Sequence, residues 1–475
     1  MLPPKSNFSE WYHEIIQQAE IMDIRYPVKG LYVWFPFGFK LRNLIYGKLR
    51  EIMDREHDEV YFPALIPETE LGKEGQHIKG FEDEVYWITH GGLDRLDVKL
   101  ALRPTSETAM YPMFRLWIRS HADLPLRVYQ IVNVFRYETK HTRPLIRLRE
   151  ITSFKEAHTA HRNYEEAEEN VKMAVNAYKE FFDSLAIPYF VIKRPEWDKF
   201  PGADYTIAFD TIMPDGRTLQ IGTVHHLADN FARTFDIKYE TPEGDHAYVH
   251  QTCYGISERC VASVISIHGD DVGLILPFHL APHQAVIIPI LYKEREREVL
   301  ELSKEIFSRM KELGLRVILD DSDERPGAKY YKWELFGVPL RIEIGPREAE
   351  NREVVVSFRD EKVKRKIPAE EITEERIAEW ADEMHERLRR RALDSMLEKV
   401  RFFENLTEME EWMGRGVVLF HLCESLECGE SIEDQVKAGV LGEVIEMPEG
   451  IEADRDGKCI ICGGDGKLNA IAKSY

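Results

Sequence analysis

Residues 134–150 read Val-Phe-Arg-Tyr-Glu-Thr-Lys-His-Thr-Arg-Pro-Leu-Ile-Arg-Leu-Arg-Glu. The β-branched and aromatic run that leads into them predicts a strand, which we expect to continue through Arg136 and Glu138. Side chains two apart on a strand point to one face, so the guanidinium and the carboxylate should lie together. Such a pair suits a nucleoside triphosphate, because arginine neutralises phosphoryl charge and a carboxylate accepts from an exocyclic amine. The alternative is an ordinary ion pair, which contributes little at a surface.

The composition is typical of a globular protein, since 44% of the 475 residues are hydrophobic and 11% are aromatic. The sequence contains no apolar run that could span a bilayer, and its first residues contain no apolar signal core. Six cysteines in a chain of this length favour a reducing compartment. We therefore expect a cytoplasmic protein without a membrane partner. The net charge of −21 means that any nucleic acid must meet a locally basic face.

Several ordered motifs carry a resemblance to a known family. Residues 135–138 (Phe-Arg-Tyr-Glu), followed by a loop and Arg147, resemble motif 2 of class II aminoacyl-tRNA synthetases. Residues 103–107 (Arg-Pro-Thr-Ser-Glu) and 222–226 (Gly-Thr-Val-His-His) are similar to the prolyl-tRNA synthetases of the archaeal and eukaryotic type. The resemblance implies that ATP, with Mg²⁺, activates L-proline and that the prolyl group passes to tRNA(Pro).

The same resemblance assigns roles to individual residues. Those expected to bind proline are Thr105, Glu107, Arg136, Phe154, His158 and His225. Those expected to bind ATP are Arg136, Glu138, Arg147, Gln220, Thr223, Ser257 and Arg259, with Arg136 and Arg259 as the catalytic pair. The chemistry is reasonable, because a carboxylate is the natural partner of a buried ammonium group. An arginine in the first turn of a helix likewise adds its charge to the exposed N–H groups there.

Parts of these motifs also have simpler explanations. Residues 105–107 could be only a helix cap, and the paired histidines 225–226 could be only structural. The segment that ends at His158 departs from the family pattern Glu-Phe-Leu-Trp-Gln-Glu-Gly-His. Aligned at His158, it has Phe154 in place of the tryptophan and one additional residue. Further along, Asn163 predicts the cap of a long helix, and the turn at residues 214–216 predicts a hairpin.

Residues 286–358 alternate between strand-like and helix-like segments, which predicts a mainly parallel α/β sheet. This region resembles the anticodon-binding domain of histidyl-, threonyl- and prolyl-type synthetases. Glu334, Arg341 and Arg347 match positions that read guanines, and arginine can bind a guanine edge through two hydrogen bonds. Glu334 and Arg341 could instead be a simple ion pair between a helix and a strand.

Four of the six cysteines form two close pairs, Cys423-x4-Cys428 and Cys459-x2-Cys462. In a reducing compartment this spacing indicates a tetrahedral zinc site. A redox role would require a thioredoxin-like context, which the surrounding sequence lacks. The pairs lie far from Arg136 in the sequence, so a structural Zn²⁺ is expected rather than a catalytic one.

The sequence thus predicts an α+β protein: an antiparallel class II catalytic sheet with helices (residues 1–280), an α/β anticodon-binding domain (281–385) and a small zinc-bearing α/β domain (386–475). A helix over 38–55 and a strand over 59–65 resemble motif 1, which implies a homodimer. Residues 138–255 leave no room for a large editing insertion, and apolar pockets reject near-isosteres poorly, so some activation of cysteine is expected. The competing hypotheses are a threonyl- or histidyl-type synthetase and a synthetase-like binding protein without catalysis.

Overall fold

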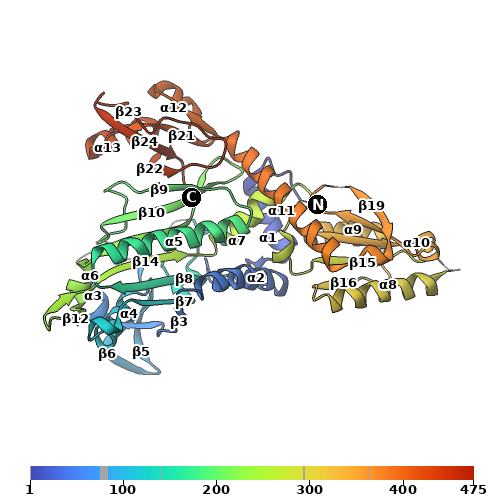
Figure 1. Ribbon diagram of the computed structural model, residues 1–475, viewed down its shortest axis with the longest axis horizontal. Coiled ribbons are helices and arrows are strands. Elements are labelled where there is room, and N and C mark those ends of the chain that lie inside the picture. The colour runs from blue at the N-terminus through green and yellow to red at the C-terminus, as the bar shows by residue number, and fades with distance from the viewer. Residues whose placement is uncertain (1, 75–83, 140, 293–294, 362) are drawn as a thin grey trace.

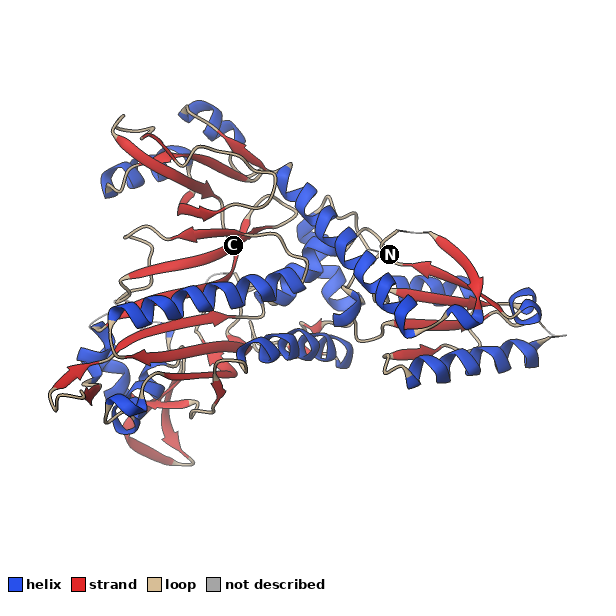
Figure 2. Ribbon diagram, in the orientation of Figure 1, coloured by secondary structure: helices blue, strands red, loops and turns tan. Residues whose placement is uncertain are grey.

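The computed structural model describes residues 2–74, 84–139, 141–292, 295–361 and 363–475. A large sheet with its helices lies on one side of the molecule and a separate α/β unit on the other (Figure 1). The long helix α11 (Glu374–Leu397) runs between them. Strands and helices are mixed throughout (Figure 2), and the α+β class predicted from the sequence is confirmed.

The main sheet has 12 strands within the described residues, in the order β20-β21-β24-β22-β9-β10-β11-β14-β8-β7-β3, with β23 paired to β24. Its first part consists of β3 (Asp58–Glu59), β7 (Leu126–Phe135), β8 (Glu150–His161), β9 (Phe190–Lys193), β10 (Tyr205–Ile212), β11 (Thr218–Ala228) and β14 (His250–Ile256). From β7 to β9 all neighbouring pairs are antiparallel, as expected for this sheet. The hairpin β10–β11 is confirmed, and its turn contains Gly216 at φ +84°.

The alternation of side chains along each strand decides which face of the sheet a side chain lies on. On β8, Lys155 points toward the covering helices, where its Nζ donates to the hydroxyl of Tyr178 at 3.1 Å. Phe154, Glu156 and His158 therefore face the opposite side of the sheet. The covering helices are α1 (Phe8–Gln18), α2 (Pro36–Met53), α5 (Tyr164–Ser184) and α7 (Arg259–His268), which share one apolar core with the sheet.

The start of α5 agrees with the sequence, because the side chain of Asn163 accepts from the N–H of Glu166 at 2.8 Å. On the other side of the sheet, α4 (Glu107–Trp117) and α6 (Asn230–Phe235) contribute to a second core. The remaining small elements of this region are β1 (Met22–Asp23), β2 (Val33–Trp34), β4 (Leu65–Pro67), α3 (Glu68–Glu74), β5 (Trp87–Gly91), β6 (Asp94–Leu102), β12 (Lys238–Glu240) and β13 (His246–Tyr248).

Two sequence predictions about strands are wrong in this region. The strand expected over 59–65 is two short strands, because the chain crosses from the main sheet to a small one. Val60 donates to the carbonyl of Tyr129, whereas Ala64 accepts from the N–H of Arg103. The strand expected to carry Arg136 and Glu138 ends at Phe135. Beyond it the chain turns, and the backbone N–H of residue 138 donates a hydrogen bond to the carbonyl of residue 136 at 2.7 Å.

The second region contains a five-stranded sheet in the order β16-β15-β17-β18-β19. Its elements are β15 (Ala285–Pro289), α8 (Glu296–Glu312), β16 (Val317–Leu319), α9 (Pro326–Leu335), β17 (Leu340–Ile344), α10 (Pro346–Asn351), β18 (Glu353–Phe358) and β19 (Lys364–Pro368). Only half of its pairings are parallel, so the sheet is mixed and not mainly parallel. The connection over 345–352 is too short for a parallel crossover, which forces β18 to run antiparallel to β17.

The C-terminal region extends the main sheet. Its elements are β20 (Val400–Phe402), α12 (Leu406–Trp412), β21 (Val417–Leu422), α13 (Leu426–Val436), β22 (Gly439–Glu446), β23 (Asp456–Lys458) and β24 (Asp465–Ala472). β22 pairs antiparallel with β9, and Val444 lies opposite Ile192. Ile192 belongs to the same apolar cluster as Leu419 and Leu468 of the C-terminal strands. Among the described helices, none has the length and apolar character needed to cross a membrane.

Candidate active site

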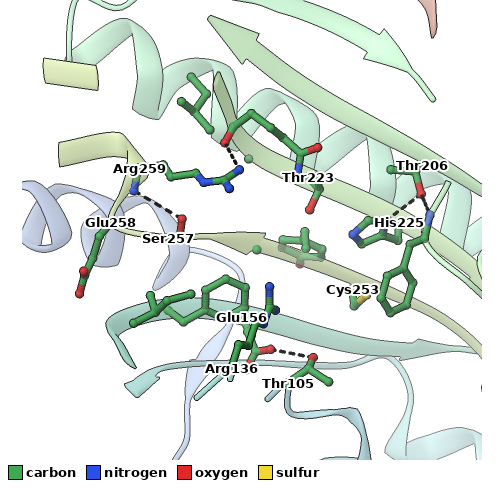
Figure 3. A pocket seen from close by; sticks show the side chains of 18 of the residues that line it. Thr105, Arg136, Glu156, Thr206, Thr223, His225, Cys253, Ser257, Glu258 and Arg259 are labelled. Carbon is green, nitrogen blue, oxygen red and sulfur yellow. Dashed lines mark hydrogen bonds between the residues drawn. The ribbon is translucent and has the colours of Figure 1, made fainter. Parts of the chain in front are cut away.

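A cavity of about 330 Å³ opens on the face of the main sheet opposite α5. Every residue that the sequence assigned to proline or ATP lines it: Thr105, Glu107, Arg136, Glu138, Arg147, Phe154, His158, Gln220, Thr223, His225, Ser257 and Arg259. Figure 3 shows Ser257 and Arg259 at one end of this cavity and Thr206 and His225 at the other. Residues more than 150 positions apart in the sequence thus meet in one place.

Three guanidinium groups line the cavity: Arg259 lies at the first end, and Figure 3 shows Arg136 beside Glu156 and Thr105. Arg259, the first residue of α7, donates from Nε to the carbonyl of Ile146 at 3.0 Å. Burial, followed by the positive charges of Arg136 and Arg147, lowers the pKa of Arg259 to about 10. Glu138 supplies a nearby negative charge, with its carboxylate 3.6 Å from Arg147. This excess of positive charge favours binding of a polyanion, because each added negative charge relieves repulsion between the arginines.

Two buried carboxylates lie at the second end. Glu107 is the first residue of α4, and Glu156 lies on β8. The hydroxyl of Thr105 contacts both, donating to Glu107 and lying 3.2 Å from Glu156, and Ser106 donates to the other oxygen of Glu156. Burial, reinforced by the charge of Glu107, raises the pKa of Glu156 to about 7. The hydroxyl of Thr105 has one proton and cannot donate it to both carboxylates. When Glu156 is protonated, its carboxyl group can donate a hydrogen bond to the oxygen of Thr105.

Rings and imidazoles also line the cavity. The guanidinium of Arg136 lies 5.6 Å from the ring centre of Phe154 and donates to the backbone at 3.1 Å. His158 lies 3.0 Å from the hydroxyl of Tyr111, and His225 lies 2.9 Å from the hydroxyl of Thr206. Burial lowers the pKa of both histidines, for His225 to about 3, so both imidazoles are neutral.

A bulge interrupts the pairing of β7 with β8 just before Phe154. Val132 lies opposite Phe154, but Val134 lies opposite Ile151, so β8 advances three residues where β7 advances two. A bulge of this kind leaves one residue unpaired and restores the alternation beyond it. Phe154 therefore faces the cavity in the same phase as Glu156 and His158.

Several residues in the cavity were not found from the sequence. The clearest is Arg194, buried beside β9, which bonds to Asp210 at 2.9 Å and to the side-chain oxygen of Gln220 at 2.9 Å. Its Nη1 also donates to the carbonyl of Leu441 on β22 at 2.8 Å. Glu156 and Thr206 were missed as well. Each is a single residue without a motif of its own, so only the three-dimensional fold reveals its position.

A separate cavity of about 260 Å³ lies in the second region and is lined by Glu334 and Arg341. Arg341 donates to Glu334 at 2.6 Å and to Glu343 at 3.0 Å, and its guanidinium lies 4.1 Å from the ring centre of Tyr330. The ion pair expected as an alternative is therefore present, but it lies in a cavity. Arg347 is not among the residues that line this cavity: Arg341 lies near the start of β17, whereas Arg347 follows the other end of the strand.

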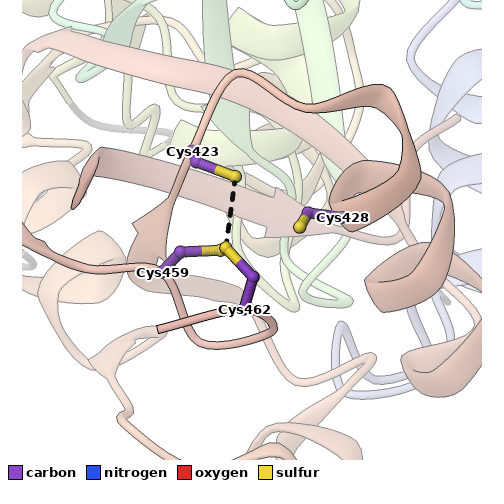
Figure 4. Close-up of side chains that lie close together, drawn as sticks. All are labelled: Cys423, Cys428, Cys459 and Cys462. Atoms are coloured by element: carbon purple, nitrogen blue, oxygen red, sulfur yellow. Dashed lines mark hydrogen bonds between the residues drawn. The ribbon is translucent and has the colours of Figure 1, made fainter. Parts of the chain in front are cut away.

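The four paired cysteines come together at the edge of the C-terminal region. One Sγ atom from each of Cys423, Cys428, Cys459 and Cys462 lies within 4.8 Å of the other three (Figure 4). The sulfur atoms of Cys423 and Cys462 are 3.8 Å apart. A tetrahedron with Zn–S bonds of about 2.3 Å has edges of about 3.8 Å, so this donor set fits zinc. Partial burial opposes ionisation of Cys459, but backbone N–H groups of Cys462, Cys423 and Ile461 lower its pKa to about 6.

Two family models match the chain. Residues 86–268 match the family model "tRNA synthetase class II core domain (G, H, P, S and T)", and residues 284–380 match the model "Anticodon binding domain". The chain is 70% identical over 474 residues to "Proline--tRNA ligase" of Archaeoglobus fulgidus, covering 100% of both chains. This chain belongs to the prolyl-tRNA synthetase family. A second prolyl-tRNA synthetase, from Methanothermobacter thermautotrophicus, is 57% identical over 462 residues, covering 96% of this chain and 94% of the relative.

Solved structures of prolyl-tRNA synthetases have the same fold. The Giardia lamblia enzyme in complex with prolyl-adenylate superposes with a TM-score of 0.93 at 36% identity, covering 100% of this chain and 99% of the other. The Cryptosporidium parvum enzyme complexed with halofuginone and AMPPNP has a TM-score of 0.94 at 33% identity, with the same coverage. The chain is therefore an aminoacyl-tRNA ligase, and a threonyl- or histidyl-type assignment is not supported.

Proposed function

We propose that the cavity performs both steps of tRNA(Pro) charging. A carboxylate oxygen of L-proline attacks the α-phosphorus of ATP, which forms prolyl-adenylate and releases pyrophosphate. A hydroxyl of the terminal ribose of tRNA(Pro) then attacks the carbonyl carbon, and AMP leaves. The observation that carries this proposal is one cavity lined by three arginines and two buried carboxylates, with Arg136 beside Glu156 and Arg259 toward one end (Figure 3). In this cavity ATP, a polyanion, can bind next to the ammonium group of proline.

At the arginine end, Arg136 and Arg259 neutralise charge as it develops on the transferred phosphoryl group. Arg147, Gln220, Thr223 and Ser257 complete the contacts to ATP, and Glu138 accepts from the exocyclic amine of adenine. Mg²⁺ bound with ATP would supply further positive charge at the phosphates, in addition to that of Arg136 and Arg259. Because the attacking carboxylate is already ionised, the step depends on positioning and charge neutralisation and not on a general base.

At the carboxylate end, Glu107 pairs with the secondary ammonium of proline and Thr105 donates to or accepts from the substrate. Phe154, His158 and His225 surround the pyrrolidine ring. If Glu107 and Glu156 were both ionised, their negative charges would repel one another. The raised pKa of Glu156 favours its protonated form, which reduces this repulsion. The pocket therefore suits a single cationic nitrogen.

The test is amino-acid-dependent ATP–pyrophosphate exchange over all twenty amino acids. We expect exchange to be strongest with proline and to be lost in Arg136→Ala. Arg341→Ala is the matched control, because it removes an arginine from the other cavity and should keep exchange while it weakens charging of tRNA(Pro). Exchange that persists in Arg136→Ala, or that prefers another amino acid, refutes the proposed site.

Cysteine is the proposed competing substrate. It is similar in size to proline, and the walls formed by Phe154 and the neutral imidazoles of His158 and His225 offer few groups that reject it. We expect cysteine-dependent exchange above the background without amino acid. Exchange with cysteine that equals this background refutes the proposal.

Binding of the anticodon of tRNA(Pro) is proposed for the cavity that contains Glu334 and Arg341. Tyr330 stacks on the guanidinium of Arg341 and holds its plane, and a flat guanidinium can bind a guanine edge through two hydrogen bonds. Arg347, at the other end of β17, would contact a different nucleotide. The four-cysteine cluster is proposed to hold a structural Zn²⁺, which fixes the loops around β21 and β23.

We also propose a homodimer formed through α4 and the segment after β3. The large apolar side chains exposed there include Tyr61 at 77%, Leu116 at 58% and Trp117 at 42%. Exposed apolar groups of this size favour a protein partner. We expect Trp117→Asp to sediment as a monomer, and an unchanged sedimentation coefficient refutes this interface. Cytoplasmic location is proposed because all six cysteines are free of disulfides.

A further inference from the structure

Three potential metal ligands from three separate elements meet in the cavity. They are Glu107 at the start of α4, His158 on β8 and Cys253 on β14. One ligand atom of each lies within 4.8 Å of the other two, and the three residues are 3%, 1% and 5% exposed. All three line the cavity, and Figure 3 shows Cys253 at its carboxylate end.

The sheet itself holds two of these groups in place. Cys253 and His158 lie directly opposite each other on neighbouring antiparallel strands, where side chains on one face are close together. The hydroxyl of Tyr111 is hydrogen-bonded to Nδ1 of His158 at 3.0 Å, so Nε2 is the nitrogen that would bind a metal. A hydrogen bond to the other ring nitrogen is the usual support of a metal-binding histidine.

The chemistry of this donor set is that of zinc. A thiolate, an imidazole and a carboxylate are all zinc ligands, and three protein ligands with a fourth open position are typical of zinc sites in active-site clefts. Bonds of about 2.0 to 2.3 Å place tetrahedral ligand atoms about 3.5 Å apart. Side-chain rotations that shorten these distances by at most about 1.3 Å therefore suffice to form the site.

We propose that Glu107, His158 and Cys253 form a second zinc site, separate from the four-cysteine cluster, and that Zn²⁺ bound there excludes proline. The exclusion rests on the proposed role of Glu107 as partner of the proline ammonium group. Zn²⁺ and that ammonium are both cations, and they would compete for the single buried carboxylate of Glu107. Free zinc is then a competitive inhibitor of proline activation.

The first test uses full-length enzyme already saturated with zinc at the four-cysteine cluster. Added Zn²⁺ should raise the apparent KM for proline in pyrophosphate exchange and leave kcat at saturating proline unchanged. Cys253→Ala should need at least about tenfold more zinc for the same rise, because it lacks one of three ligands. Cys260→Ala is the matched control, since Cys260 is a buried cysteine on α7 outside the cavity lining.

The second test detects metal without relying on activity. Co²⁺ bound to a thiolate gives a near-ultraviolet charge-transfer band, which should appear in the wild type, disappear on addition of proline and be absent from Cys253→Ala. The displacement of Co²⁺ by proline is measured on the wild type and does not depend on whether a variant folds. If Cys253→Ala does not fold, Cys253→Ser takes its place. Zinc inhibition that is equal in both variants, or a cobalt band that proline leaves unchanged, overturns the second site. Loss of all proline-dependent exchange without added zinc would instead overturn the proposed function.

Discussion

Glu258 provides the sharpest test of the electrostatics of the site. This glutamate precedes Arg259 at the start of α7, is fully buried and accepts a hydrogen bond from the hydroxyl of Thr152. Burial raises its pKa from 4.5 to about 7, although hydrogen bonds from Thr152 and Ser153 act in the opposite direction. We consider the replacement Glu258→Gln, which keeps the shape of the side chain and removes the titration.

The sign and size of the effect follow from linkage. Between pH 4.5 and about 7 the unfolded chain has lost this proton while the folded chain keeps it, so the free energy of unfolding falls as pH rises. At 1.36 kcal/mol for each pH unit, the total is about 3 kcal/mol. The entropy of unfolding of a chain of this length is about 1 kcal/mol per kelvin, so the difference amounts to about 3 °C in Tm. In Glu258→Gln this decrease in the free energy of unfolding with rising pH is absent.

The assay is Tm by scanning calorimetry at a series of pH values from about 4.5 to 8, with identical zinc loading. We expect the Tm of Glu258→Gln minus that of the wild type to increase by about 3 °C across this range, whatever its value at the acid end. Effects of pH on the cysteine cluster cancel in this difference. Glu169→Gln, at an exposed position of α5, is the control and should give a constant difference. A difference for Glu258→Gln that is constant or decreases with pH refutes the reasoning.

Three further changes test other contacts. Arg194→Met removes the donor to Gln220 and should raise the KM for ATP by roughly tenfold in pyrophosphate exchange, with the KM for proline little changed. Thr206→Val removes the hydroxyl that supports His225 and should raise the KM for proline by roughly fivefold, measured in the same assay. Cys462→Ser removes one of four sulfur atoms from the cluster; we expect zinc to be lost on dialysis, measured by atomic absorption, and Tm to fall by several degrees.

Local signals in the sequence predicted local structure well. Asn163 marks the start of α5, and the turn around Gly216 joins β10 to β11 as expected. The ordered motifs also led to every residue assigned to ATP and proline, and all of them meet in one cavity. The cap and the turn were predicted correctly because each is encoded within a few neighbouring residues.

Features that depend on distant contacts were not predicted. The pairing of β22 with β9 joins strands about 250 residues apart, and no local pattern indicates it. The same pairing brings the carbonyl of Leu441 to Arg194, a residue of the cavity lining. The mixed sheet of the second region is a different case, since the short connection over 345–352 already excluded a parallel crossover between β17 and β18.

The pairing of β22 with β9 also affects how the protein can be divided. Without residues 386–475, β9 would be an open edge of the sheet, and its backbone N–H and C=O groups that now face β22, along Val191, Ile192 and Lys193, would be unpaired. Open apolar edges recruit strands from other molecules, which leads to aggregation. The C-terminal region therefore protects the catalytic sheet from self-association, and a shortened chain that ends before it should be insoluble even though every ATP and proline residue is present.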